Sequence, residues 1–353
     1  MPDWGGHHNA KNNTPIRAAI IGLGRLGSRH ARHLVEKIQG VDLVAACALE
    51  DDQLQWAHDE LGVETTYKDY KEMIDKENID TIFIVAPTPF HPEMTIYAMN
   101  AGLNVFCEKP LGLDFDEVAE MAKVIKEHPK QIFQSGFMRR YDESYRYAKK
   151  IVDEGGIGDI IYMRGYGIDP ISGMESFTKF ATEADSGGIF VDMNIHDVDL
   201  IRWFTGQEPV QAYGLTSNLA APELEKIGES ETGVAQLKMN GGVIATLIGG
   251  RHAAHGNQVE LEVMGSNGWL RVGEHPDLNR VTVFNENGVT RPSLQSFGER
   301  FDNAFTDEVQ DFVNNVAKGT QPNVTVDDGI KALKIAKACQ ESADTVQLVD
   351  INL

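Results

Sequence analysis

Runs of apolar residues alternate with amphipathic segments along the first third of the chain. Segments rich in Ile, Val, Ala and Phe predict strands buried on both faces at 16–21, 41–47, 81–86, 104–107 and 132–137. Apolar residues at helical spacing predict intervening helices after residue 27 and at 54–61, 93–101 and 114–125, the last capped by Asp114. This alternation predicts a doubly wound α/β domain with a parallel sheet over residues 15–138, preceded by a loose polar arm at 1–14.

The pattern changes after residue 138. A helix at 143–154 is followed by predicted strands at 160–166, 233–239, 243–248, 259–264, 269–272 and 281–284. The turn Asn240-Gly241-Gly242 is typical of a hairpin, and short turns between adjacent strands favour antiparallel pairing. Two helices, 301–317 and 328–343, are expected to close the chain. Residues 139–353 therefore read as an α+β domain with an open, largely antiparallel sheet.

Length and charge limit the class of protein. A chain of 353 residues is long enough for two hydrophobic cores. Its formal net charge of -21 disfavours nucleic acid and anionic membranes as partners. The three cysteines lie far apart without a CxxC pair, which is typical of reduced thiols in the cytoplasm. No apolar run reaches the roughly 18 to 20 residues of a membrane span, and no signal-peptide pattern begins the chain.

Three glycines follow the first predicted strand as Gly22-x-Gly24-x-x-Gly27. In a strand-turn-helix setting the first turns the chain, the second lets a pyrophosphate approach the backbone, and the third lets helix and strand pack closely. The helix N-terminus then offers unpaired N–H groups to the phosphates. This motif predicts a dinucleotide-binding Rossmann domain; the alternative is a glycine-rich turn that only closes a βα unit.

The end of the second strand bears on the choice between NAD and NADP. Dinucleotide folds usually place an acidic residue there for the adenosine ribose, but this chain has Ala48. Glu50, Asp51 and Asp52 follow, and no Arg or Lys is present in this loop to receive a 2'-phosphate. We therefore expect NAD rather than NADP, with the ribose contact shifted to Glu50 or lost.

Two later strands also end in polar loops, which should border the cofactor because ligands bind outside the carboxyl ends of parallel strands. The first loop contains Thr88, Pro89 and His91, where His91 could instead be a helix-start residue without a ligand. The second is Glu108-Lys109-Pro110, in which the proline restricts the backbone of Lys109 and aims its ammonium. The alternative for Lys109 is an ordinary surface lysine.

The segment 186–200 carries a second set of polar residues. Taken as one helix, it places Asp192, His196 and Asp199 on one face at spacing i, i+4, i+7. A carboxylate one turn away would orient His196 as a general base. A zinc site with His252 or His255 as a further ligand is an alternative, but the acid–base interpretation requires no metal. The stripe could also be a satisfied structural network.

These motifs together resemble the glucose-fructose oxidoreductase, inositol dehydrogenase and rhizopine-catabolism (Gfo/Idh/MocA) family. The resemblance rests on the glycine motif with His30, Pro87-Thr88-Pro89 with His91, Glu108-Lys109-Pro110, Asp192-x-x-x-His196, Phe305-x-x-Glu308-Val309-x-x-Phe312 and Asp327-Asp328-Gly329-x-x-Ala332-Leu333. Within the family, residues 137–142 resemble the inositol dehydrogenases most closely. Ala48 and the segment 167–170 depart from the family pattern.

The resemblance implies hydride transfer between NAD(P) and a secondary alcohol of a cyclitol or sugar, in a homotetramer built as a dimer of dimers. His196 would act as base, Asp192 would orient it and bind a neighbouring hydroxyl, and Lys109 would stabilise alkoxide charge. Other substrate contacts are expected from Arg139, Asp169 and Asn194. Cofactor contacts are expected from Gly22, Gly24, Arg25, Leu26, Gly27, Glu50, Thr88, Pro89, His91, Glu108 and Lys109. Relatives that act as NAD-dependent glycosidases or as non-catalytic, dinucleotide-binding regulators supply the alternatives.

Overall fold

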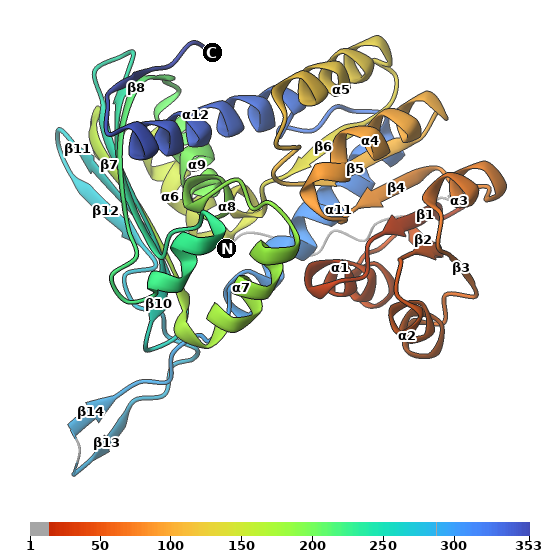
Figure 1. Ribbon diagram of the computed structural model, residues 1–353, viewed down its shortest axis with the longest axis horizontal. Coiled ribbons are helices and arrows are strands. Elements are labelled where there is room, and N and C mark those ends of the chain that lie inside the picture. Colours follow the sequence, from red (N-terminus) through yellow and green to blue (C-terminus); the bar gives the residue numbers. More distant parts are fainter. Residues whose placement is uncertain (1–13, 287) are drawn as a thin grey trace, which may run out of the picture.

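A six-stranded parallel sheet forms the N-terminal part of the protein, at the right of Figure 1. The computed structural model describes residues 14–286 and 288–353. Strand order in this sheet is β3-β2-β1-β4-β5-β6. The strands are β1 (Ile16–Ile21), β2 (Val41–Cys47), β3 (Thr65–Tyr67), β4 (Thr81–Ile84), β5 (Asn104–Glu108) and β6 (Phe133–Gly136). Every neighbouring pair is parallel, so all six carboxyl ends lie at one edge.

Helices connect these strands. They are α1 (Arg25–Glu36), α2 (Asp51–Leu61), α3 (Tyr70–Lys76), α4 (His91–Asn100) and α5 (Phe115–Glu127), with the short 3-10 turn η1 (Thr88–Phe90) before α4. Asp114 caps α5 as expected, because its side chain accepts hydrogen bonds from the N–H groups of Asp116 and Glu117. The strands and helices thus form the predicted doubly wound domain.

A seven-stranded mixed sheet forms the second part, at the left of Figure 1. Its order is β12-β11-β7-β10-β9-β8-β15, and only β7 and β10 pair in parallel. The strands are β7 (Ile160–Pro170), β8 (Pro209–Ser217), β9 (Thr232–Met239), β10 (Ile244–Ala253), β11 (Gln258–Gly265), β12 (Trp269–Val272) and β15 (Val349–Asp350). The predicted hairpin at 240–242 is confirmed as the β9–β10 connection.

The remaining helices cover one face of this second sheet or pack against the first sheet. They are α6 (Glu143–Asp153), α7 (Met174–Glu183), α8 (Ile189–Asp192), α9 (Ile195–Thr205), α10 (Phe297–Arg300), α11 (Asp302–Lys318) and α12 (Val326–Thr345), with 3-10 turns η2 (Met138–Tyr141), η3 (Ile171–Gly173) and η4 (Pro222–Ile227). Figure 1 shows α12 running from β8 toward α5, both of which it contacts. No helix in the described ranges has the length and apolar character needed to cross a membrane.

The C-terminal segment also contributes to the core of the first sheet. On α11, Phe312 makes edge-on ring contacts with Phe83 of β4 and Phe106 of β5. Val309 and Val313 of the same helix belong to that cluster and are fully buried. The predicted domain boundary at residue 138 stays a prediction. Helix α11 follows this boundary in the sequence but packs on the N-terminal sheet that precedes it.

The fold class is confirmed, but two predicted elements are wrong. The strand expected at 281–284 to extend the main sheet is instead β13 (Val283–Asn285), which pairs with β14 (Gly288–Thr290) in a separate projecting hairpin (Figure 1). Gly273, with a φ of +77°, ends β12 and turns the chain away. The single helix expected across 186–200 is broken into α8 and α9. The arm expected at 1–14 lies almost wholly outside the described residues.

Candidate active site

The glycine loop between β1 and α1 is shaped by steric contacts. A Cβ at Gly22, where φ is +92°, would lie 2.4 Å from the carbonyl oxygen of Val85, and one at Gly27 would lie 2.0 Å from that of Gly22. A Cβ at Gly24 would meet nothing within 4 Å. The first and third glycines are therefore required by the protein, whereas the second leaves open space at the N-terminus of α1, where a pyrophosphate fits.

The predicted acidic loop lies at the N-terminus of α2. Ala48 is buried, whereas Glu50 and Asp51 are exposed, and Asp51 forms an ion pair of 2.7 Å with Lys68. Lys68 follows β3 and was not considered from the sequence, because it reaches this loop only through the pairing of β2 with β3. The loop therefore keeps an acidic excess, but one of its carboxylates is neutralised.

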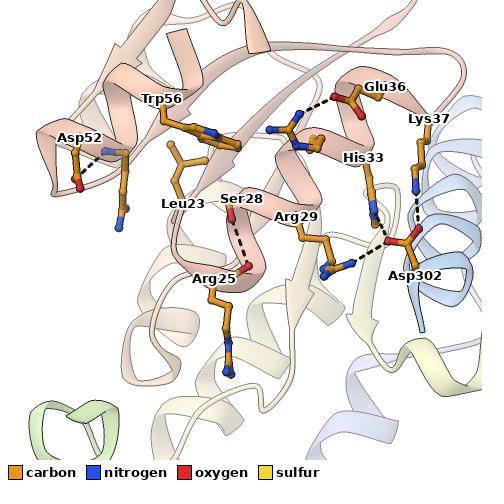
Figure 2. A pocket seen from close by; sticks show the side chains of 12 residues that line it. Leu23, Arg25, Ser28, Arg29, His33, Glu36, Lys37, Asp52, Trp56 and Asp302 are labelled. Carbon is orange, nitrogen blue, oxygen red and sulfur yellow. Dashed lines mark hydrogen bonds and ion pairs between the residues drawn. The ribbon is translucent and has the colours of Figure 1, made fainter. Parts of the chain in front are cut away.

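A cavity of about 730 Å³ lies beside the glycine loop, between α1 and α2 (Figure 2). Arg29 and His33 of α1 and Lys37, which follows that helix, face this cavity, and all three contact Asp302. Burial lowers the pKa of His33 to about 4. Arg25 points away from this cluster in Figure 2, and its guanidinium lies 5.3 Å from the ring centre of Phe297. Leu26 is half-buried in the first turn of the same helix.

The structure places His91 inside the protein rather than against a ligand. Its Nε2 lies 2.7 Å from the carbonyl oxygen of Ala86, and its Nδ1 lies 2.8 Å from that of Pro110. Burial lowers the pKa of His91. The ring thus ties the end of β4 to the turn after Lys109, and the predicted cofactor contact is wrong for this side chain. Thr88 and Pro89 lie in η1, where Pro89 is exposed and Thr88 is half-buried.

Glu108 also points inward, which corrects the prediction of a cofactor contact. Its Oε1 accepts a 2.7 Å hydrogen bond from His30 Nε2, and its Oε2 accepts the N–H of Lys109 at 3.2 Å. Both His30 and Glu108 are buried. The buried pair therefore holds the backbone of Lys109 through its N–H group. Because successive side chains of a strand point to opposite faces, the side chain of Lys109 points away from that of Glu108.

Lys109 joins the two parts of the protein. Its Nζ donates a 3.0 Å hydrogen bond to the carbonyl oxygen of Asp192. Burial lowers the pKa of Lys109, while the negative charges of Asp192 and Glu108 oppose that shift. The ammonium is consequently directed to the second part of the site, as the sequence predicted, and is not an ordinary surface lysine.

The break between α8 and α9 separates Asp192 from His196. Asp192 ends α8 and His196 is in the first turn of α9, with Met193 and Asn194 between the helices. The Asp192 carboxylate binds Arg251, whose Nη1 lies 2.8 Å from Oδ2, and not the imidazole. The prediction that Asp192 orients His196 is therefore wrong. Burial raises the pKa of Asp192, but the charges of Arg251 and Lys109 more than offset this effect and hold it below its ordinary value.

His196 is buried beside Phe137, with its ring edge-on at a centroid distance of 5.9 Å. Its Nδ1 has no hydrogen-bond partner among residues 14–286 and 288–353. Burial, together with the positive charges of Lys109 and Arg139, lowers the pKa of His196 well below 6.5. The imidazole is therefore neutral at pH 7 and is able to accept a proton.

Arg139 and Asn194 are held by Asp197, a residue for which the sequence predicts no role. Arg139 Nη1 binds Asp197 Oδ1 at 2.6 Å, and Asn194 Nδ2 binds Asp197 Oδ2 at 2.9 Å. The same Asn194 nitrogen lies 3.2 Å from the carbonyl oxygen of Ile248. Asn194 is completely buried, and its predicted substrate contact stays a prediction. Asp197 could have been found as a further carboxylate next to His196, but nothing in the sequence pairs it with Arg139.

The remaining predicted residues fall on both sides of the site. Asp169, on β7, accepts a 3.1 Å hydrogen bond from Asn257, and burial and the nearby Asp192 raise its pKa. Asp199 is instead bound by Arg140 at 2.7 Å and is part of the core. His252 pairs with Glu231 at 3.6 Å, and His255 contacts Gln258 at 3.1 Å. Within residues 14–286 and 288–353, no group of three His, Cys, Asp or Glu side chains is arranged to hold a metal ion.

A Rossmann domain whose strand ends carry a lysine and face a neutral histidine and two carboxylates from the second part of the protein defines a class of dinucleotide-dependent oxidoreductases. Family models agree with this class: residues 16–137 match an oxidoreductase family with an NAD-binding Rossmann fold, and residues 145–271 match the GFO/IDH/MocA C-terminal domain. The chain belongs to this family.

Several relatives are named for inositol oxidation. The chain is 32% identical to the myo-inositol 2-dehydrogenase of Thermotoga maritima, over 95% of this chain and 98% of that protein. It is 86% identical to the solved myo-inositol 2-dehydrogenase of Lactobacillus plantarum, with a TM-score of 0.95 over 96% of this chain and all of that one. It is 47% identical to a scyllo-inositol dehydrogenase of Lactobacillus casei solved with NAD(H) and scyllo-inositol, with a TM-score of 0.93 over 95% and 99% of the two chains.

Proposed function

We propose that this protein is an NAD-dependent inositol 2-dehydrogenase that oxidises a ring hydroxyl of an inositol to the ketone, with His196 as the base. The observation that carries the proposal is the approach of Lys109 Nζ to the Asp192 carbonyl, which brings the strand ends of the dinucleotide domain against α8 and α9. Relatives named for this reaction cover nearly the whole chain and support the substrate class.

The residues around the glycine loop fit a dinucleotide. Space at Gly24 and the first turn of α1 would receive the pyrophosphate, and the acidic loop at Glu50 favours a ribose that carries no 2'-phosphate. Bound NAD supplies the hydride acceptor at nicotinamide C4. NADP is the less favoured cofactor, because Asp52 and Glu50 would repel its additional phosphate.

The chain's own residues then manage the proton and the developing charge. As the C–H bond is broken and its hydride leaves, the hydroxyl proton passes to the neutral imidazole of His196. Lys109 donates a hydrogen bond to the hydroxyl oxygen, whose negative charge grows until the carbonyl forms. Asp192 keeps one side-chain oxygen available for a neighbouring ring hydroxyl, since only its Oδ2 binds Arg251 and its side chain is 30% exposed. Asp169 and Arg139 are further candidates for holding ring hydroxyls.

A substrate panel tests the proposal. Purified protein is incubated with NAD and myo-inositol, scyllo-inositol, other inositols and common aldoses, and NADH is followed by absorbance. Turnover with one or more inositols is expected. Turnover of a nitrophenyl glycoside without accumulation of NADH would identify a glycosidase instead, and NADH binding without turnover of any polyol would identify a regulator.

We propose that the protein forms a homotetramer through the uncovered face of the seven-stranded sheet. Exposed apolar side chains lie on that face across several strands: Tyr213, Leu215, Val234, Ile244 and Trp269. Burying such a patch against a second copy would remove it from water. Light scattering should give four chains, and Ile244→Glu should reduce that number; a monomeric wild type would contradict the proposal.

We also propose a cytoplasmic location. The three cysteines are free thiols and are buried in separate places, which is typical of proteins from reducing compartments. Fractionation of the source cells with an antibody against the chain would test this location.

A further inference from the structure

Arg251 is a buried arginine at the end of β10 that the proposed reaction does not use directly. Its side chain is 3% exposed, and its Nη1 donates the 2.8 Å hydrogen bond to Asp192 Oδ2. Its Nε donates to the carbonyl oxygen of Ser230 at 3.3 Å. Burying a guanidinium carries a large desolvation free energy unless it is paired, so this fixed arrangement indicates a functional role for Arg251.

The other groups around Arg251 fix the plane of its guanidinium. Phe177, on α7, places its ring centre 3.4 Å from the guanidinium carbon, which is a close cation–π stack. Glu229 Oε2 lies 3.7 Å from Nη2, and the other oxygen of Glu229 accepts a hydrogen bond from Ser186. Stacking and pairing together allow the planar fork to point one donor at Asp192.

The pKa of Asp192 depends on Arg251 more than on the other charged neighbours. The cations that face Asp192 are Arg251 from β10, Lys109 from the end of β5 and Arg25 from α1, and Arg251 has the largest effect in lowering the pKa of Asp192. The opposing carboxylates are Asp169 on β7 and Glu229, with Asp185 acting on Glu229. Removing Arg251 would leave Asp192 half-buried among like charges, which favours its protonation.

A shift of Asp192 would also change the position of the Lys109 ammonium, because the two residues are hydrogen-bonded. The Lys109 ammonium donates to the main-chain oxygen of Asp192, while Arg251 holds the side chain of the same residue. We propose that Arg251, stacked on Phe177 of α7, is a positioning residue that holds Asp192 and, through it, aligns the Lys109 ammonium for the alcohol oxidation. This inference rests on the proposed function.

The test compares Arg251→Met with Arg251→Lys. In Arg251→Met, we expect kcat/KM for the inositol to fall by about 10- to 100-fold, the range that small misplacement of a reacting group produces. An acidic loss of rate due to Asp192, separate from the limb of His196, should appear, because Asp192 takes up its proton more readily without the cation. Arg251→Lys keeps the charge but not the stacked fork, so it should recover part of the rate and most of the pH profile. The Kd for NADH should change less than about twofold.

Arg202→Met is the matched control. Arg202 lies on α9 beyond His196, and its side chain is also largely buried, at 9% exposed. Its Nε donates a 2.7 Å hydrogen bond to Glu208. Its loss should lower the Tm without moving the pH profile. If Arg251→Met changes only the Tm, as this control does, Arg251 is merely structural and the inference is overturned.

A cycle of thermal unfolding separates the inference from the proposed function. The cycle compares the Tm of Arg251→Met, of Asp192→Asn and of the double variant. If Arg251→Met does not fold, Arg251→Lys and Phe177→Leu take its place in the cycle. We expect strong non-additivity between Arg251→Met and Asp192→Asn, because each change removes the same ion pair, and weaker non-additivity where Arg251→Lys or Phe177→Leu is used. Additive changes in Tm would overturn the inference even if the wild type oxidises an inositol. Absence of turnover in the wild type would refute the proposed function, and the coupling would still be decided by the cycle.

Discussion

The glycine loop and the region around Asp192 and His196 lie on opposite sides of the same site, and they are built by different forces. At the loop, neighbouring backbone atoms define the shape, since a Cβ at Gly22 or Gly27 would overlap a carbonyl group. Around Asp192, by contrast, charge dominates: Arg251 and Lys109 lower the pKa of Asp192, whose own charge raises the pKa of Asp169. Substitutions at the loop should therefore act on binding in an all-or-none manner, whereas those near Asp192 should change rate and pH dependence by degrees.

The two sides also differ in how their histidines are used. His91 has carbonyl oxygens beside both ring nitrogens, while Nδ1 of His196 is unpaired in the part of the chain that the structure describes. Burial lowers the pKa of both. A histidine occupied by the backbone holds a loop in place, and one with an unpaired nitrogen can exchange a proton. We therefore expect the same residue type to serve structure on one side and chemistry on the other.

Gly24→Val should have the largest effect. A Cβ at this position meets no protein atom within 4 Å, and φ at Gly24 is -67°, so the chain should fold with a loss of only about 1 kcal/mol at the helix N-cap. The valine would occupy the pyrophosphate space, and fluorescence titration should detect no NADH binding. Gly27→Val is the contrasting variant, because its side chain overlaps the Gly22 carbonyl and should prevent folding. Normal NADH affinity in Gly24→Val would contradict the assignment of the loop.

His196→Ala should lower kcat by about 10² to 10⁴, the usual contribution of general acid–base catalysis. NADH affinity should stay nearly constant, since the imidazole lies on the substrate side. Because the pKa of His196 is well below 6.5, the wild-type rate should remain level as pH falls through 6.5 and decline only at lower pH. That limb should disappear in the variant. His128→Ala, a change at a distant helix end, is the control; near-normal turnover in His196→Ala would assign the base to another group.

Lys109→Met should reduce kcat by about 10² to 10³, which is the usual cost of removing one donor to a developing oxyanion. This variant should keep the limb due to His196, because a charge and not the proton acceptor has been removed. The limb should move to higher pH, since the Lys109 charge lowers the pKa of His196 in the wild type. A profile identical to that of His196→Ala would show that Lys109 is itself the base.

The preference for NAD is expected to be the smallest of these effects. Wild-type kcat/KM should favour NAD over NADP by at least about tenfold, because like charges repel at the acidic loop. Asp51→Ala should change this ratio little, since Lys68 already neutralises that carboxylate, whereas Glu50→Lys should shift it toward NADP. Equal values for both cofactors in the wild type would show that Ala48 leaves room for the 2'-phosphate.

Local sequence was enough to predict the dinucleotide domain and its loop. Buried parallel strands require continuous apolar runs, and the glycine spacing of 22, 24 and 27 meets steric demands that arise within a few residues. Lys109 was predictable for the same reason, because it directly follows a strand whose carboxyl end must face the ligand. The hairpin at 240–242 is another local feature that the structure confirms.

Only the tertiary structure decided how the charged residues pair. Helical spacing suggested that Asp192 would bind His196, but Asn194 finds partners in Asp197 and Ile248, the helix is interrupted, and Arg251 from a distant strand takes the carboxylate. His91 and Glu108 likewise turn inward because Pro110 and His30 offer buried partners there. Sequence spacing determines which side chains lie on the same local element. Buried polar groups, however, need hydrogen-bond partners, and those partners come from whichever segment packs against them in the fold.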